Sequence, residues 1–181
     1  FELVFSAEQM EVYKNTFARP TATLVGRGRV VSGTDAMFEI MASKDYDPTA
    51  EVLLEAPLPV ALPENPPADL GTVEITDRQS TYVDLTANAA APCILVLADC
   101  YYPGWKAYID DEPTEIFSAY YAFRGIVLPE GEHTVRFRYE PWTFYAGLAV
   151  SSVTCIAGIL VALYILLVQR RKKRTTQTVA S

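Results

Sequence analysis

Residues 146–168 read AGLAVSSVTCIAGILVALYILLV, a run of 23 residues without a charged side chain. At about 1.5 Å per residue, a helix of this length extends roughly 35 Å, which exceeds the roughly 30 Å hydrocarbon core of a bilayer. Buried helices of globular domains are usually shorter and carry a polar face. The stretch therefore predicts a transmembrane helix, which we place with its flanks at residues 142–169.

The flanks of this stretch suit the two surfaces of a membrane. Trp142 and Tyr145 precede it, and Arg170 and Arg171 follow it. Amphipathic aromatic rings favour the headgroup region, and long basic side chains extend toward headgroups. We expect these four residues to lie at the membrane interfaces.

The sequence RRKKR at residues 170–174 sets the expected orientation. Loops on the cytoplasmic side of a span carry an excess of Lys and Arg. Residues 170–181 are therefore predicted to form a basic cytoplasmic tail. Residues 1–141 are predicted to form an extracytoplasmic domain.

The predicted outer domain is strongly acidic. Residues 1–145 hold all 22 acidic residues but only ten of the 15 basic ones, a net charge of −12. An acidic surface repels phosphate backbones, so the composition argues against nucleic-acid binding.

The first residues, FELVFSAEQMEVYKN, contain no basic segment followed by an apolar one. Nothing upstream of residue 141 could carry an acidic domain across a membrane. We expect the chain to be the C-terminal part of a longer membrane protein whose N-terminal transmembrane core is missing. A single tail anchor is the competing interpretation, but it would leave the domain in the cytoplasm, against the basic tail.

The outer domain shows a period of two that is typical of strands. Val135, Phe137 and Tyr139 alternate with charged residues, and residues 92–98 are apolar on both faces, as in a central strand covered on both sides. Short strands at intervals of about ten residues predict a mainly β fold, an antiparallel β-sandwich. Because Pro141 ends the last strand directly before the span, the sandwich should lie close to the membrane.

Two segments interrupt the strands. Residues 34–43 predict a short helix with Asp35 as its N-cap. Residues 56–70, APLPVALPENPPADL, hold five prolines and predict a stiff connector without regular structure.

The search for catalytic or metal-binding residues gives no candidate. His133 is the only histidine, and the three cysteines form no CxxC pair. On an extended strand Cys93 and Cys100 would lie about 23 Å apart, too far for a disulfide. The acidic run at residues 110–112 is interpreted as a solvated hairpin turn. We therefore expect no catalytic residue, metal or cofactor in this chain.

Aromatic residues gather at residues 99–108, DCYYPGWKAY, and again at residues 119–125, AYYAFRG. Trp105 is in phase with Ala107 and Ile109, so we assign it to the core. One interpretation is that all of these rings serve packing, with Phe123 and Phe137 as further core residues. The alternative is that the exposed remainder contacts a glycan or a phosphate, since rings suit sugar faces and cations suit phosphates; this set comprises Tyr102, Lys106, Tyr108 and Arg124.

The sequences YYPGWKAYID and YAFRGIVLPEGEHTVRFRYEP, followed by the apolar helix, resemble the C-terminal end of the bacterial YfhO family of membrane proteins. Asp111 stands where the family usually has a glycine. The resemblance implies a polytopic protein of the bacterial cell membrane that is similar to GT-C glycosyltransferases. These enzymes use polyprenyl-phosphate sugars, and family members are linked to glycosylation of envelope polymers such as lipoteichoic acid.

The resemblance places the catalytic acid of such an enzyme in an early loop, upstream of this chain. The first hypothesis is therefore a non-catalytic accessory domain with the last membrane helix. Its expected partners are the bilayer, the missing transmembrane core and a polyprenyl-phosphate sugar or envelope polymer. The rival hypothesis is a membrane-tethered binding or scaffold module that is not part of an enzyme.

Overall fold

The computed structural model describes residues 1–8, 10–16 and 18–179, and within residues 167–179 it describes the helix but not the side chains. The chain divides into two compact units, Phe1–Glu140 and Pro141–Ser181.

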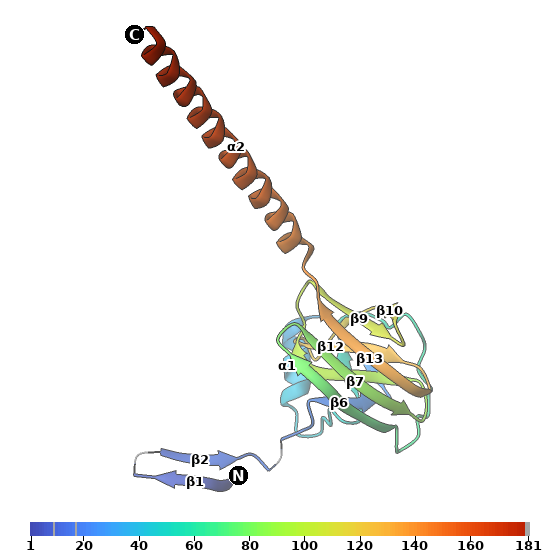
Figure 1. The fold of residues 1–181 in the computed structure, drawn as a ribbon. Coiled ribbons are helices and arrows are strands. Elements are labelled where there is room, and N and C mark those ends of the chain that lie inside the picture. The colour runs from blue at the N-terminus through green and yellow to red at the C-terminus, as the bar shows by residue number, and fades with distance from the viewer. Residues whose placement is uncertain (9, 17, 180–181) are drawn as a thin grey trace. The chain divides into compact units, whose positions relative to one another are not determined.

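The described residues form mainly strands (Figure 1). In chain order the elements are β1 (Glu2–Ala7), β2 (Met10–Lys14), β3 (Ala22–Val25), β4 (Gly28–Val30), α1 (Thr34–Ala42), β5 (Val52–Leu54), β6 (Gly71–Gln79), β7 (Tyr82–Ala89), β8 (Cys93–Cys100), β9 (Trp105–Ile109), β10 (Glu112–Thr114), β11 (Phe117–Ala119), β12 (Phe123–Leu128), β13 (Gly131–Tyr139) and α2 (Trp142–Val179).

Two large sheets make up the first unit. One has the order β10-β9-β13-β7-β6, and the other has the order β3-β8-β12-β11-β5-β4. Strands β1 and β2 pair only with each other. The predicted mainly β fold with one C-terminal apolar helix is confirmed.

One strand pair departs from the expected antiparallel arrangement. Strands β4 and β5 are parallel, with Gly28 opposite Val52. Helix α1 lies between them in the sequence and supplies the crossover that a parallel pair needs. The other strand pairs in the described residues are antiparallel.

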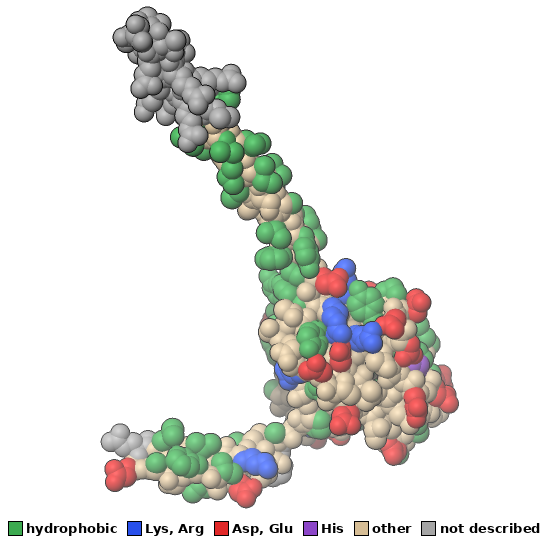
Figure 2. All heavy atoms as spheres, in the orientation of Figure 1, with side chains coloured by type: hydrophobic (Ala, Val, Ile, Leu, Met, Phe, Trp, Pro, Cys, Tyr) green, Lys and Arg blue, Asp and Glu red, His purple; other side chains and the backbone are tan. Residues whose placement is uncertain are grey.

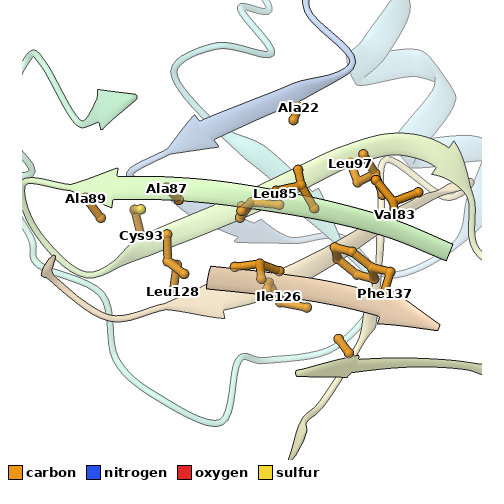
Figure 3. Packing of buried hydrophobic residues seen from close by; sticks show 13 residues of the cluster. Ala22, Val83, Leu85, Ala87, Ala89, Cys93, Leu97, Ile126, Leu128 and Phe137 are labelled. Carbon is orange, nitrogen blue, oxygen red and sulfur yellow. The ribbon is translucent and has the colours of Figure 1, made fainter. Parts of the chain in front are cut away.

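The main core lies between the facing sides of the two sheets. Strands β7, β9 and β13 contribute Leu85, Ala107 and Phe137 from one sheet, and β8 and β12 contribute Leu97 and Ile126 from the other. Figure 3 shows Leu85, Leu97, Ile126 and Phe137 packed between the strands. Burying one Leu, Ile or Phe side chain stabilises the fold by about 1.5–3 kcal/mol, so this cluster is the main source of stability.

A second core covers the opposite face of the six-stranded sheet. Ile94 and Val96 of β8 point into it, whereas Cys93 and Leu95 point into the main core. Met37 of α1 is buried in the second core. The prediction that residues 92–98 form a strand covered on both sides is confirmed.

The helix and the proline-rich segment form this outer cover. Helix α1 matches the predicted residues within one position, but its N-cap is Gly33, at φ 93°, and not Asp35. The proline-rich segment has no helix or strand, as expected, yet it is not a free connector. Leu58 and Leu62 pack against the second core, and a Cβ on Gly26 would lie 2.6 Å from Pro66 Cβ.

The acidic run forms the predicted hairpin turn between β9 and β10. Asp110 and Asp111 have φ angles of 50° and 70°, the left-handed values of a two-residue turn in which glycine is usual. Their carboxylates hold the turn in place. Asp110 Oδ2 lies 2.6 Å from His133 Nδ1, and Asp111 pairs with Arg136.

The second unit is the helix α2. Its segment Trp142–Leu166 is long and apolar enough to cross a membrane. Within it the hydroxyls of Ser152 and Thr154 donate to backbone carbonyls four residues earlier, which suits an apolar surrounding.

Helix α2 also runs through most of the segment that was predicted as a separate tail. Residues 169–179 contain no Pro or Gly, so nothing in the sequence ends the helix earlier. Trp142 and Tyr145, two of the predicted interface residues, have exposed side chains. The side chains of Arg170 and Arg171 lie outside the described residues.

Candidate functional site

The most unusual side chain of the β-rich unit is Arg124 in β12. It points to the main core, in phase with Ile126 and Leu128, and is completely buried. Among the described residues it is the one charged side chain in the buried set. A buried guanidinium is costly unless it is paired.

Two aromatic rings and one carboxylate surround Arg124. Its Cζ lies 3.7 Å from the centre of the Trp105 ring and 5.4 Å from that of Phe137. Its Nη2 donates to Asp99 Oδ2 over 2.7 Å. Burial lowers the pKa of Arg124, and Asp99 opposes this shift. The group remains charged, because an arginine is not deprotonated in proteins.

Asp99 is shared between two guanidinium groups. Its Oδ2 also accepts from Arg78 Nη2 over 3.3 Å, and its Oδ1 accepts the backbone N–H of Cys100 over 3.0 Å. Arg78 comes from β6 at the edge of the other sheet, and its side chain is about half exposed (46%). The cluster of Arg78, Asp99 and Arg124 therefore carries one surplus positive charge.

This cluster lines an open hollow of about 730 Å³, which we call the Arg124 pocket. Its lining residues are Arg78, Gln79, Ser80, Asp99, Cys100, Tyr102, Trp105, Arg124 and Tyr139. Asp99 is the one acidic residue in this set. The Nε and Nη1 atoms of Arg124 are buried and have no hydrogen-bond partner among the described residues. The pocket thus combines surplus positive charge with aromatic walls.

The four predicted contact residues do not form one surface. Tyr102 lines the Arg124 pocket and is 59% exposed. Lys106 and Tyr108 alternate with the inward-facing Ala107, so they lie on the outer face of the five-stranded sheet, opposite Arg138 and Arg136. Strand alternation therefore separates them from the pocket.

Two predicted residues have a different exposure from the one expected. Arg124 was expected on the exposed surface and is buried, because it continues the inward phase of β12. Phe123 was expected in the core but is 36% exposed. A register irregularity between these two residues lies at the start of β12. Phe137 is fully buried, and Trp105 is partly buried against the main core.

The outer face of the five-stranded sheet is charged but internally paired (Figure 2). Lys106 Nζ lies 2.8 Å from Glu140 Oε2, and both oxygens of Asp84 accept from Arg138. Hydrogen bonding to Asp84 raises the pKa of Arg138. Pairs of this kind contribute little at a surface and leave no surplus charge. The outer face is therefore a weaker candidate than the pocket.

A second cluster of polar groups lies under α1. The Tyr46 and Tyr120 hydroxyls both contact the Glu51 carbonyl, and Tyr120 also donates to the Pro48 carbonyl over 2.5 Å. Burial raises the pKa of Tyr46 to about 12 and raises that of Tyr120 as well. Both groups stay protonated donors and act in holding the loop after α1.

Other reactive groups are few. Among the described residues, no set of three or more His, Cys, Asp or Glu side chains is arranged to hold a metal ion. Cys93 and Cys100 are free thiols at opposite ends of β8. Burial raises the pKa of the Cys93 thiol to about 11, so it is a poor nucleophile.

Sequence reasoning missed Asp99 and Arg78. Asp99 opens the aromatic segment that was singled out, so its position was a usable signal. Arg78 had no such signal, because it lies 21 residues before Asp99 in the chain, on an edge strand of the other sheet. The spacing of Arg124 with Ile126 and Leu128 along β12 was a usable signal of its inward orientation.

Residues 70–151 match the model of one protein family, described as "Bacterial membrane protein YfhO". The match runs from β6 to the first turns of α2 and includes the lining residues of the Arg124 pocket. No curated protein and no solved structure matches the chain. The predicted resemblance to the YfhO family is confirmed for this region.

Proposed function

We propose that this region of a YfhO-family membrane protein is the C-terminal accessory domain and last membrane helix of a polytopic, glycosyltransferase-like enzyme. The enzyme would transfer sugars from polyprenyl-phosphate carriers to polymers of the bacterial cell envelope. In this proposal residues 1–141 lie outside the cytoplasm and the C-terminus lies inside. The domain binds and orients an anionic substrate and leaves the chemistry to the transmembrane core.

The Arg124 pocket is the observation that carries the proposal. Surplus guanidinium charge beside Tyr102 and Trp105 suits a phosphate that is attached to a sugar, because guanidiniums pair with phosphates and rings pack on sugar faces. The rest of the domain is acidic, so a cluster with surplus positive charge supports the binding of an anionic ligand.

The place of the pocket in the chain agrees with a lipid-linked ligand. Tyr139 lines the pocket, and Pro141 is the one residue between the strand-bearing unit and the helix that starts at Trp142. Each residue extends the chain by at most about 3.6 Å, so covalent connection alone keeps this end of β13 near the start of the span.

A binding role fits the state of the polar groups better than a catalytic role. The Asp99 carboxylate accepts from two guanidiniums and an amide, which leaves it little capacity to take a proton from a substrate. The buried tyrosines are held as donors to backbone carbonyls. In this proposal the catalytic acid belongs to the transmembrane core.

Kinetics of the full-length parent test the binding role. Arg78→Gln should raise the apparent KM for the donor or acceptor more than it lowers kcat, because the contact is made in the ground state as well as in the transition state. Sugar transfer by the purified 181-residue chain alone would contradict the accessory role. Full parental activity after deletion of residues 70–140 would favour a scaffold module over an enzyme part.

Topology is tested separately. A reporter fused after Ser181 should be active only as a cytoplasmic fusion, because the RRKKR sequence is expected to stay inside. A fusion that is active only outside the cytoplasm would contradict the proposed orientation. The two reporters commonly used for opposite compartments serve as controls for each other.

A further inference from the structure

We infer that the Arg124 pocket is a binding site for a phosphate monoester or diester group, contacted by Arg78 and held in a positive field by Arg124. This inference deepens the proposed function, on which it rests only for the source of the phosphate.

The charges around the Arg124 pocket do not cancel. Arg78 and Arg124 both pair with Asp99, and the described lining of the pocket holds no second carboxylate. A dianion or monoanion would remove the surplus. Electrostatic attraction is strongest where water is partly excluded, and Arg124 is fully buried.

The hydrogen bonds of the two arginines do not balance either. A guanidinium has five N–H donors, and the Nε and Nη1 groups of Arg124 lack partners among the described residues. Arg78 makes one contact, with Asp99, and is half exposed, so most of its planar fork faces the hollow or the solvent. Planar forks of this kind suit the paired oxygens of a phosphate.

Arg124 and Arg78 have different roles at the pocket. The Trp105 and Phe137 rings flank the Arg124 guanidinium, and Asp99 fixes it, so this group does not move to a ligand. Arg124 is therefore a positioning residue that holds Asp99 and supplies charge. Arg78 contacts the phosphate, and the Tyr102 and Ser80 hydroxyls at the pocket can donate to its remaining oxygens.

Competition between the ligand and Asp99 follows from this arrangement. Asp99 Oδ2 lies 3.3 Å from Arg78 Nη2, a longer contact than the 2.7 Å to Arg124. The weaker of the two contacts is the one that a phosphate would replace. Removing the Asp99 charge should therefore strengthen phosphate binding.

The test uses the full chain in a non-ionic detergent without phosphate. Trp142→Phe leaves Trp105 as the remaining tryptophan, and its ring reports on the guanidinium above it. Titration with methyl phosphate should change Trp105 fluorescence with saturation, whereas sodium chloride at equal ionic strength should not. A response that does not saturate, or that chloride reproduces, would overturn the inference.

A matched pair of variants shows whether the pocket is responsible. Arg78→Gln should weaken binding by roughly tenfold or more. Arg136→Gln, which removes an equally charged side chain of similar exposure paired with Asp111, should leave binding unchanged. Equal weakening in both variants would mean general attraction to a charged surface and would overturn the site.

Asp99→Asn should change the affinity for methyl phosphate, which would stay the same if Asp99 had only a structural role. The folded variant should bind methyl phosphate more tightly than the parent chain, and saturating phosphate should raise its melting temperature more. Weaker binding by the folded variant would contradict competition at Arg78 and overturn the inference. If this variant does not fold, the comparison of Arg78→Gln with Arg136→Gln still decides.

Two lipid arms identify the source of the phosphate. In nanodiscs with phosphatidic acid, loss of the response to methyl phosphate supports a lipid headgroup as the ligand. A response equal to that in lipid-free detergent supports a soluble phosphate ester in the same site. Lack of binding in every arm would refute this inference and would leave sugar transfer by the full-length parent undecided. A parent that binds methyl phosphate in this pocket but transfers no sugar would refute only the proposed function.

Discussion

Substitution Asp99→Asn keeps the shape of the side chain and removes its negative charge, which leaves the buried Arg124 without a counter-ion. Breaking a buried ion pair from one side costs about 3–5 kcal/mol, because the remaining charge is neither paired nor hydrated. The Asp99 side chain is 32% exposed, so solvent screens part of this cost. We expect a loss of about 2–3 kcal/mol in the free energy of unfolding.

For a unit of this size, a loss of 1 kcal/mol lowers the melting temperature by about 3–5 °C, so Asp99→Asn should lower it by roughly 10 °C. The melt is followed through Trp105 fluorescence in the full chain with Trp142→Phe. Phosphate-free buffer is needed, because a bound phosphate would replace the missing charge.

Asp84→Asn is the matched control. Asp84 also pairs with an arginine and is similarly buried, with 25% of its side chain exposed. Its partner Arg138, however, is 30% exposed, whereas the Arg124 side chain is 1% exposed. The control should therefore cost less than about 1 kcal/mol.

A double variant separates a lost contact from a stranded charge. Adding Arg124→Met to Asp99→Asn removes the stranded charge and keeps a side chain of similar length between the aromatic rings. This variant should recover much of the lost stability. Equal losses in Asp99→Asn and Asp84→Asn, or no recovery in the double variant, would refute the view that burial of Arg124 sets the cost.

Three further predictions concern the rest of the fold. In unfolding experiments Gly71→Ala should cost more than about 2 kcal/mol and Gly33→Ala about 1 kcal/mol. Both glycines have positive φ, but a Cβ on Gly71 would lie 1.9 Å from a backbone carbonyl oxygen, whereas one on Gly33 would meet nothing within 4 Å. Equal costs for the two substitutions would contradict the clash at Gly71. In thiol labelling, the exposed Cys100 should react in the folded protein and the buried Cys93 only on unfolding, and equal native rates would refute this burial. The pKa of Asp110 lies below its ordinary value of 3.8, because the His133 ring donates a hydrogen bond to its carboxylate. The Asp110 carboxylate is therefore protonated at a higher pH in the unfolded chain than in the folded one. The folded state loses stability as the pH falls below about 3.8. Asp110→Asn should flatten this loss in melts between neutral and acidic pH, and an unchanged profile would contradict the assignment.

The strand pattern and the apolar helix could be predicted from the sequence because each depends on local periodicity. The run at residues 92–98 is apolar at every position, and a strand has only two faces, so cover on both sides followed directly. Trp105 was placed inward by its phase with Ala107. These features need no knowledge of which strands pair.

Features that depend on pairing between distant strands could not be predicted. The parallel pair β4–β5 follows from the crossover through α1, and the Arg124 pocket forms only because Arg78 and Asp99 reach the same end of the sandwich from two sheets. The error on Arg124 had a different origin. Arg124 was expected on the surface, although flanking aromatic rings and one carboxylate can accommodate a buried guanidinium.

The position of β13 in its sheet has a consequence for the order of folding. It is the last strand in the sequence, yet it pairs with β7 on one side and with β9 on the other. The five-stranded sheet therefore cannot close until residue 139 has left the ribosome, and until then β7 and β9 each have one unpaired edge. Contacts between residues so distant in sequence form slowly, and open strand edges invite aggregation. A chain that is truncated before β13 should accumulate as insoluble material, and completion of the domain is timed by the synthesis of the residues that join it to the helix.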